Sequence, residues 1–109
     1  MQKASHKGAK YTLFLRLILA ILGRGNIIIP RFNGELALIQ SFVKRGDVVM
    51  DIGANAGIYT LYLSRLVGNQ GLVMAYEPNA SVLRSLAIVS RMTRATNVRL
   101  INKACCYCR

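Results

Sequence analysis

Two acidic residues and a glycine-spaced turn are the parts of this sequence that could hold a small-molecule ligand. Asp51 lies near the end of an apolar run and is followed by Gly53 and Gly57, and Glu77 directly follows a second apolar run. A strand, a tight glycine turn and a helix start together present unpaired backbone N–H groups to a nucleotide-like ligand. An acid at the tip of the next parallel strand is placed to bind ribose hydroxyls.

The spacing of the glycine turn helps to choose the ligand. The run from Asp51 to Gly57 reads DIGANAG, which is not the G-x-G-x-x-G spacing of dinucleotide sites. A carboxylate two residues before the first glycine would repel a pyrophosphate, but it suits a ligand with a cationic amine. S-adenosylmethionine has such an amine, no phosphate, and a ribose that Glu77 could bind through its hydroxyls. The pattern therefore favours S-adenosylmethionine, with a dinucleotide as a distant alternative.

The composition is that of one packed domain, or part of one, with a strongly basic charge. The chain has 109 residues, 53% of them hydrophobic, and a net charge of +11 with only four acids. Residues 1–34 and 78–109 each carry six bases and no acid, which favours encounter with anionic partners. The sequence shows no aromatic cluster of the RNP type, no zinc-finger spacing and no clear helix-turn-helix pattern. With the glycine turn present, we regard nucleic acid as an unlikely partner.

The three cysteines are crowded at the end of the chain, at positions 105, 106 and 108. An odd number so close together cannot form a disulfide framework. A metal site would need further ligands, and the only histidine, His6, is at the other end of the sequence. We therefore expect no metal site.

The N-terminal segment contains a twelve-residue apolar stretch, Tyr11–Leu22, interrupted by Arg16. This is short of the roughly 20 residues that a membrane-spanning helix needs. Three interpretations stay open: a helix packed on the domain and ended by Gly23, an anchor on an anionic membrane surface, and a targeting peptide. We expect a cytoplasmic protein, with membrane association through this segment as an open alternative.

Hydrophobic periodicity predicts helices and strands in alternation, and therefore an α/β domain of parallel βαβ units. The expected spatial order of the strands is 3-2-1, with helices on both faces. The first strand is apolar at nearly every position, which predicts burial on both of its faces. The expected elements are a helix over 35–44, a strand over 47–52, a helix over 58–67, a strand over 72–76, a helix capped by Asn79 or Ser81 and ending near 92, and a strand over 98–101.

Three segments resemble a known family. GDVVMDIGANAGIYTLYLSRLVG, GLVMAYEPN and NVRLINKA, in this order, are similar to the FkbM-type S-adenosylmethionine-dependent methyltransferases of the Rossmann-like class. The resemblance runs from about Gly34 to Ala104. It divides the chain into a basic, apolar segment over 1–33 and a partial cofactor-binding domain over 34–109.

The resemblance implies a role for each residue of the motifs. Asp51 would bind the methionine amine, and Glu77 would bind the ribose. From the residues alone, Asn55 and Thr60 could instead only cap the helix that follows the turn. The full set of implied cofactor-binding residues is Asp51, Gly53, Asn55, Gly57, Tyr59, Thr60 and Glu77.

The activity implied by the resemblance is methyl transfer to a hydroxyl or similar nucleophile of a small molecule or glycan. Members of the family continue past the third strand into four more strands, which supply the adenine contact, the acceptor pocket and any general base. This chain instead reaches Arg109 after the third strand, so we expect a cofactor-binding half that is inactive alone, and we assign no catalytic residue. The alternative is a non-catalytic remnant that acts as a basic module at a membrane surface or on nucleic acid.

Overall fold

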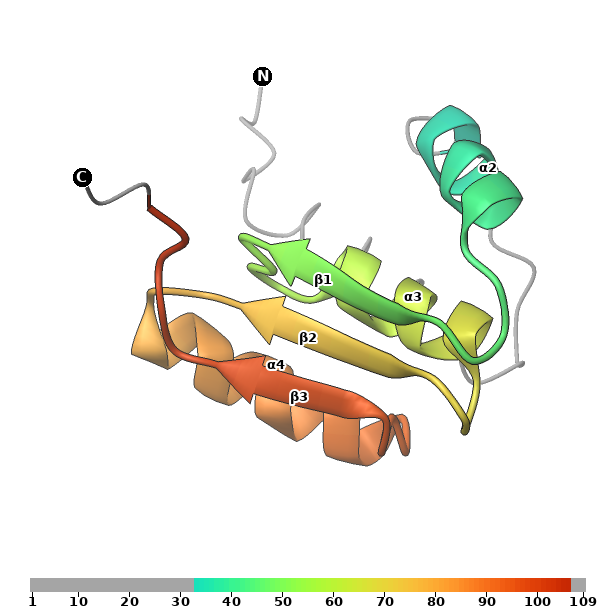
Figure 1. Cartoon of the computed structure of the whole chain (residues 1–109). Helices are drawn as coiled ribbons and strands as arrows, with labels where there is room; N and C mark the ends of the chain where they lie inside the picture. Colours follow the sequence, from blue (N-terminus) through green and yellow to red (C-terminus); the bar gives the residue numbers. More distant parts are fainter. Residues whose placement is uncertain (1–32, 107–109) are drawn as a thin grey trace, which may run out of the picture.

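The computed structural model describes residues 33–106, which form three strands and three helices in alternation (Figure 1). The predicted bounds of α3, β2 and β3 are confirmed, and β1 begins one residue later than predicted. The elements are α2 (Asn33–Phe42), β1 (Val48–Ile52), α3 (Ile58–Val67), β2 (Leu72–Tyr76), α4 (Ala80–Met92) and β3 (Val98–Ile101).

The predicted range 35–44 for helix α2 is displaced by two residues, because the chain leaves the helix before Lys44. The backbone N–H of Lys44 donates to the carboxylate of Asp47, 2.8 Å away, instead of continuing the helical pattern. Gly46 then turns the chain with φ +90°, a conformation that glycine adopts without strain. The bond between Lys44 and Asp47 and the turn at Gly46 thus lead the chain from α2 into β1.

The three strands form one parallel sheet in the order β1-β2-β3, which confirms the predicted pairing and spatial order. In the register, Val48 of β1 lies beside Leu72 of β2, and Val73 of β2 lies beside Val98 of β3. The carboxyl ends of all three strands therefore meet at one edge of the sheet, where the predicted site residues follow β1 and β2.

Helices α3 and α4 both pack on the same face of the sheet, behind the strands in Figure 1. Val73 and Ala75 of β2 are fully buried beneath them. Leu61 and Val67 of α3 and Leu86 of α4 are the largest fully buried apolar side chains on the helix side. Burial of this kind supplies most of the favourable free energy of folding in a small α/β unit.

The other face of the sheet is open among the described residues, and here the sequence prediction was wrong. Val48, Met50 and Ile52 of β1 are 66%, 54% and 59% exposed, although the strand was expected to be buried on both faces, with helices on each. Helix α2 does not cover this face, because its Ile39 packs with the cluster on the α3 side. Within residues 33–106, α3 and α4 pack on one face of the sheet, and no helix covers the face of β1 that carries Val48, Met50 and Ile52.

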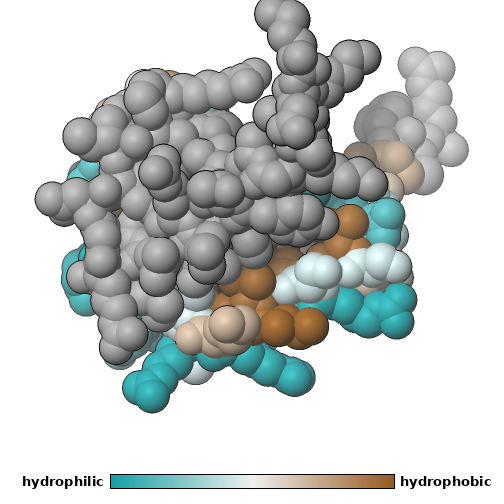
Figure 2. All heavy atoms as spheres, turned by 180° about the vertical axis from the view of Figure 1, so that it is seen from behind, coloured by the Kyte–Doolittle hydropathy of each residue, from teal (hydrophilic) through white to brown (hydrophobic). Residues whose placement is uncertain are grey.

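Predictions for the N-terminal segment and for Cys108 lie outside residues 33–106, and the domain boundary near residue 33 stays a prediction. Within 33–106, no helix combines the length and hydropathy needed to cross a membrane. Figure 2 shows apolar surface beside hydrophilic surface on the side opposite to the view of Figure 1. Among the described residues, α4 has two exposed large apolar side chains, Ile88 and Met92.

Candidate functional site

The turn that follows β1 is tied to the end of β2. The backbone N–H groups of Gly53 and Ala54 both donate to the carbonyl of Tyr76, each at 2.9 Å. Gly53 has φ +79°, and a Cβ added there would meet no atom within 4 Å. One side of the turn is thus open backbone with room for a ligand to approach.

Gly57 lies in a different environment, at the start of α3. It has φ +89°, and a Cβ there would stand 2.1 Å from Cδ1 of Leu86 on α4. Real Cβ atoms do not approach other atoms so closely, so the missing side chain is what allows the two helices to pack. The structure shows that the backbone of Gly57 lies close to Leu86 of α4. Contact between Gly57 and a ligand stays a prediction.

Glu77, at the tip of β2, is buried, with 8% of its surface exposed. Its Oε2 accepts from the backbone N–H of Asn55, and its Oε1 accepts from that of Asn79, both at 2.9 Å. These two bonds offset the cost of burying a carboxylate. Each oxygen retains further acceptor capacity, because an ionised carboxylate offers about four lone-pair sites.

Asn102, which the sequence analysis did not single out, supports this arrangement from beyond β3. Its side-chain amide donates to the carbonyls of Glu77 and Pro78, each at 3.0 Å. The available signal was its position: a polar residue directly after the third strand, at the edge where the strands' carboxyl ends meet.

Asp51, the second acid of the predicted site, is half-buried at the end of β1. Its carboxylate accepts from the hydroxyl of Thr60 at 2.5 Å, and Thr60 is buried in the first turn of α3. The positive end of the α3 dipole favours a carboxylate there. The N-cap position of α3 is Gly57 and carries no side-chain capping bond, so Thr60 holds Asp51 rather than capping the helix.

Tyr59 connects this region to α2. Its hydroxyl donates to the carboxylate of Glu35, an acid in the first turn of α2 that was not predicted as part of the site. This hydrogen bond is the main cause that raises the pKa of Tyr59, with smaller contributions from burial and from the charges of Glu35 and Asp51. A mostly apolar cavity of about 500 Å³ lies between α2, β1 and α3, with Asp51 and Tyr59 in its wall.

The structure therefore places two carboxylates around one open glycine turn, at the carboxyl ends of neighbouring strands. One side chain, Glu77, is buried and keeps acceptor capacity for hydroxyl groups. The other, Asp51, is more accessible and suits a cation. This arrangement of acceptors around an open turn could bind and orient a ligand.

Solved structures that match this fold include methyltransferases. A protein from Clostridium thermocellum proposed to be an rRNA methylase matches with TM-score 0.66 and 25% identity over 72% of this chain and 43% of its own. An S-adenosylmethionine-dependent methyltransferase from Aquifex aeolicus matches with TM-score 0.61 and 26% identity, over 70% of this chain and 42% of its own. An S-adenosylmethionine-dependent O-methyltransferase from Thermotoga maritima matches with TM-score 0.60 and 27% identity, over 80% and 34%.

This chain has the fold of the S-adenosylmethionine-dependent methyltransferases. It spans less than half of the length of each of these three proteins. No family model matches the sequence. The assignment of the methyltransferase fold thus rests on the match to solved structures.

Proposed function

We propose that this chain binds S-adenosylmethionine at the carboxyl ends of β1 and β2, as the cofactor-binding part of a methyltransferase of the FkbM type. The observation that carries the proposal is the buried carboxylate of Glu77, fixed by two backbone N–H groups beside an open glycine turn. Solved structures of the same fold, at 26% and 27% identity, are described as S-adenosylmethionine-dependent, which supports this choice of cofactor.

The residues present fit the cofactor. The acceptor capacity that remains on Glu77 suits the two hydroxyls of a ribose. Asp51, held by Thr60, suits a cationic amine, and the open side of Gly53 leaves the backbone accessible. When bound, S-adenosylmethionine supplies an electrophilic methyl group. The residues of this chain would hold and orient it, and such positioning accounts for much of the rate enhancement in group transfer.

For the acceptor, we propose a hydroxyl or similar nucleophile of a small molecule or glycan. The resemblance of the D-x-G-A-N-x-G and E-P-N segments to the FkbM-type enzymes supports this class of acceptor. One structure of the same fold is described as an O-methyltransferase, in keeping with an oxygen acceptor. No residue of this chain is assigned as general base.

Isothermal titration of the full chain with S-adenosylhomocysteine, and separately with NAD, tests the proposed cofactor. We expect binding of the first and not of the second. Glu77→Ala should weaken binding by about 1.5–3 kcal/mol, the scale of a hydrogen-bonded charged group that loses its partner. Gly53→Val should abolish binding, because a branched side chain would fill the open side of the turn.

Asp47→Asn is the matched control, because Asp47 is an acid at the opposite end of β1. It should leave the affinity for S-adenosylhomocysteine unchanged. Circular dichroism must show that each variant is folded. Unchanged affinity in folded Glu77→Ala and Gly53→Val variants would mean that the turn is only structural.

A further inference from the structure

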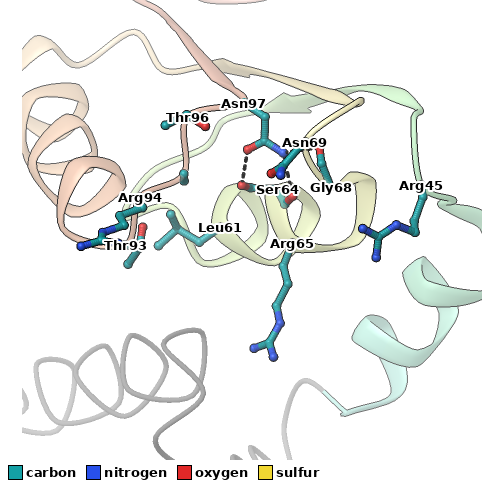
Figure 3. Close-up of a pocket in the computed structure, with 11 residues that line it drawn as sticks. Arg45, Leu61, Ser64, Arg65, Gly68, Asn69, Thr93, Arg94, Thr96 and Asn97 are labelled. Atoms are coloured by element: carbon teal, nitrogen blue, oxygen red, sulfur yellow. Dashed lines mark hydrogen bonds between the residues drawn. The ribbon is translucent and has the colours of Figure 1, made fainter.

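A second concave surface lies at the opposite end of the sheet from the proposed cofactor site. It is a pocket of about 370 Å³ between the end of α3, the end of α4 and the segments that lead into β1 and β3. We call it the basic pocket, because its wall includes Arg45, Arg65 and Arg94 and no carboxylate (Figure 3). Asp47, the acid at this end of β1, accepts the backbone N–H of Lys44 and does not line the pocket.

An ordinary explanation for arginines here would be that they neutralise the carbonyl groups at the end of α3. Other groups already satisfy much of that need. The side-chain amide of Asn97 donates to the carbonyls of Ser64 and Gly68, each at 2.8 Å, and the N–H of Gly46 donates to the carbonyl of Val67 at 2.7 Å. Capping of α3 therefore does not by itself account for Arg45 and Arg94 at this place.

Arg94 occupies a backbone position that favours glycine. Helix α4 ends in a Schellman motif: the N–H of Ala95 donates to the carbonyl of Ser90, and that of Arg94 donates to Arg91. In this motif the residue after the cap is usually glycine, and Arg94 has φ +56° there. An arginine in a strained left-handed conformation points to a role for its side chain.

The pocket suits phosphate groups. Guanidinium groups match phosphate oxygens with two parallel hydrogen bonds, and Asn69, Thr93 and Thr96 add polar groups to the wall. The side chains of the three arginines extend from separate parts of the wall and do not converge on one point (Figure 3). This arrangement fits several phosphate groups better than a single ion.

A membrane surface fits the pocket less well. Its largest apolar wall residue, Leu61, is 1% exposed, so the wall offers nothing to insert among lipid chains. The wall also contains no aromatic side chain on which a base could stack. These features favour contact with the sugar–phosphate backbone and not with the bases.

We propose that the basic pocket binds the phosphate backbone of nucleic acid without sequence preference, independently of the cofactor. Such binding requires none of the base-reading motifs that the sequence lacks. It depends on counterion release and therefore weakens as salt rises.

Fluorescence anisotropy of the full chain with a labelled single-stranded oligouridylate tests the proposal. The informative variant is Arg94→Gly, which removes the guanidinium and at the same time places the favoured residue at the left-handed position. We expect about a three- to tenfold loss of affinity and a slope of log K against log salt that is shallower by about 0.7. The melting temperature of this variant should equal or exceed that of the unchanged protein.

Arg84→Gln is the matched control, because Arg84 is exposed on α4 and does not line the pocket. The proposal predicts that it retains most of the affinity. Equal losses in Arg94→Gly and Arg84→Gln would overturn it in favour of diffuse charge attraction. Binding to phosphatidylserine vesicles but not to the oligouridylate would overturn it in favour of a membrane surface. Because the assay contains no cofactor, its result is independent of the titration with S-adenosylhomocysteine.

Discussion

The carboxylate of Glu77 accepts a hydrogen bond from the backbone N–H of Asn55, 22 residues earlier in the chain. This bond joins the tip of β2 to the turn that follows β1. Asn55 has φ +50°, so the bond also holds the turn in a conformation that few residues adopt. The residue proposed to bind the ribose is therefore also the residue that shapes the turn around the cofactor.

Glu77→Gln should lower the free energy of unfolding by about 1–3 kcal/mol, because a glutamine amide can accept only one of the two backbone N–H groups and leaves the other without a buried acceptor. Urea denaturation followed by circular dichroism measures this change. A stability equal to that of the unchanged protein would show that the N–H of Asn55 or Asn79 finds solvent instead.

The two glycines of the turn should respond differently to alanine. Gly57→Ala should lower the stability for two reasons: alanine in a left-handed conformation costs about 1–2 kcal/mol, and the clash of its Cβ with Leu86 costs about 1–3 kcal/mol. Gly53→Ala should incur only the cost of the left-handed conformation, because its Cβ would point into open space. Chemical denaturation should thus find Gly57→Ala the less stable of the two variants.

A double-mutant cycle tests the cause of that difference. Leu86→Ala alone creates a cavity, but combined with Gly57→Ala it should cost less than the sum of the two single changes, because the clash is removed. Strict additivity would show that the backbone conformation of Gly57, and not its contact with Leu86, sets the cost.

Tyr59 should titrate above the ordinary tyrosine pKa of about 10, because its hydroxyl donates to Glu35. The difference in ultraviolet absorbance between the unchanged protein and Tyr59→Phe isolates its titration. Glu35→Gln should lower the pKa of Tyr59, since it removes both the charged acceptor and the nearby negative charge. A pKa unaffected by Glu35→Gln would contradict the observed hydrogen bond.

The raised pKa of Tyr59 also fixes the sign of its contribution to stability at different pH values. The folded state holds this proton more tightly than the unfolded state, so the contribution is fully present below about pH 10 and is lost as the pH rises through the folded pKa. Unfolding midpoints should therefore fall less steeply above pH 10 in Tyr59→Phe than in the unchanged protein.

Much of this fold could be predicted from the sequence because the residues that begin and end its helices and strands lie next to those elements in the chain. Gly57 and Gly68 flank α3, and Pro78 follows β2, so the bounds of these elements depend on nearby residues. Which face of the sheet a helix covers depends on distant contacts, so the apolar pattern of β1 did not reveal that one face is open. For the same reason, the bond between Glu35 and Tyr59 had no sequence signal beyond an acid at a helix start.

The open face of β1 gives the last prediction. Val48→Thr with Ile52→Thr should leave the free energy of unfolding within about 1 kcal/mol, because each is a β-branched replacement at an exposed site. The same pair should reduce aggregation, measured by light scattering during storage, because exposed apolar strands are templates for association. Val73→Thr is the matched control: Val73 is fully buried beneath the helices, and burying a hydroxyl there should cost about 1–3 kcal/mol. A cost for the Val48 and Ile52 pair as large as that for Val73→Thr would show that this face is covered in solution.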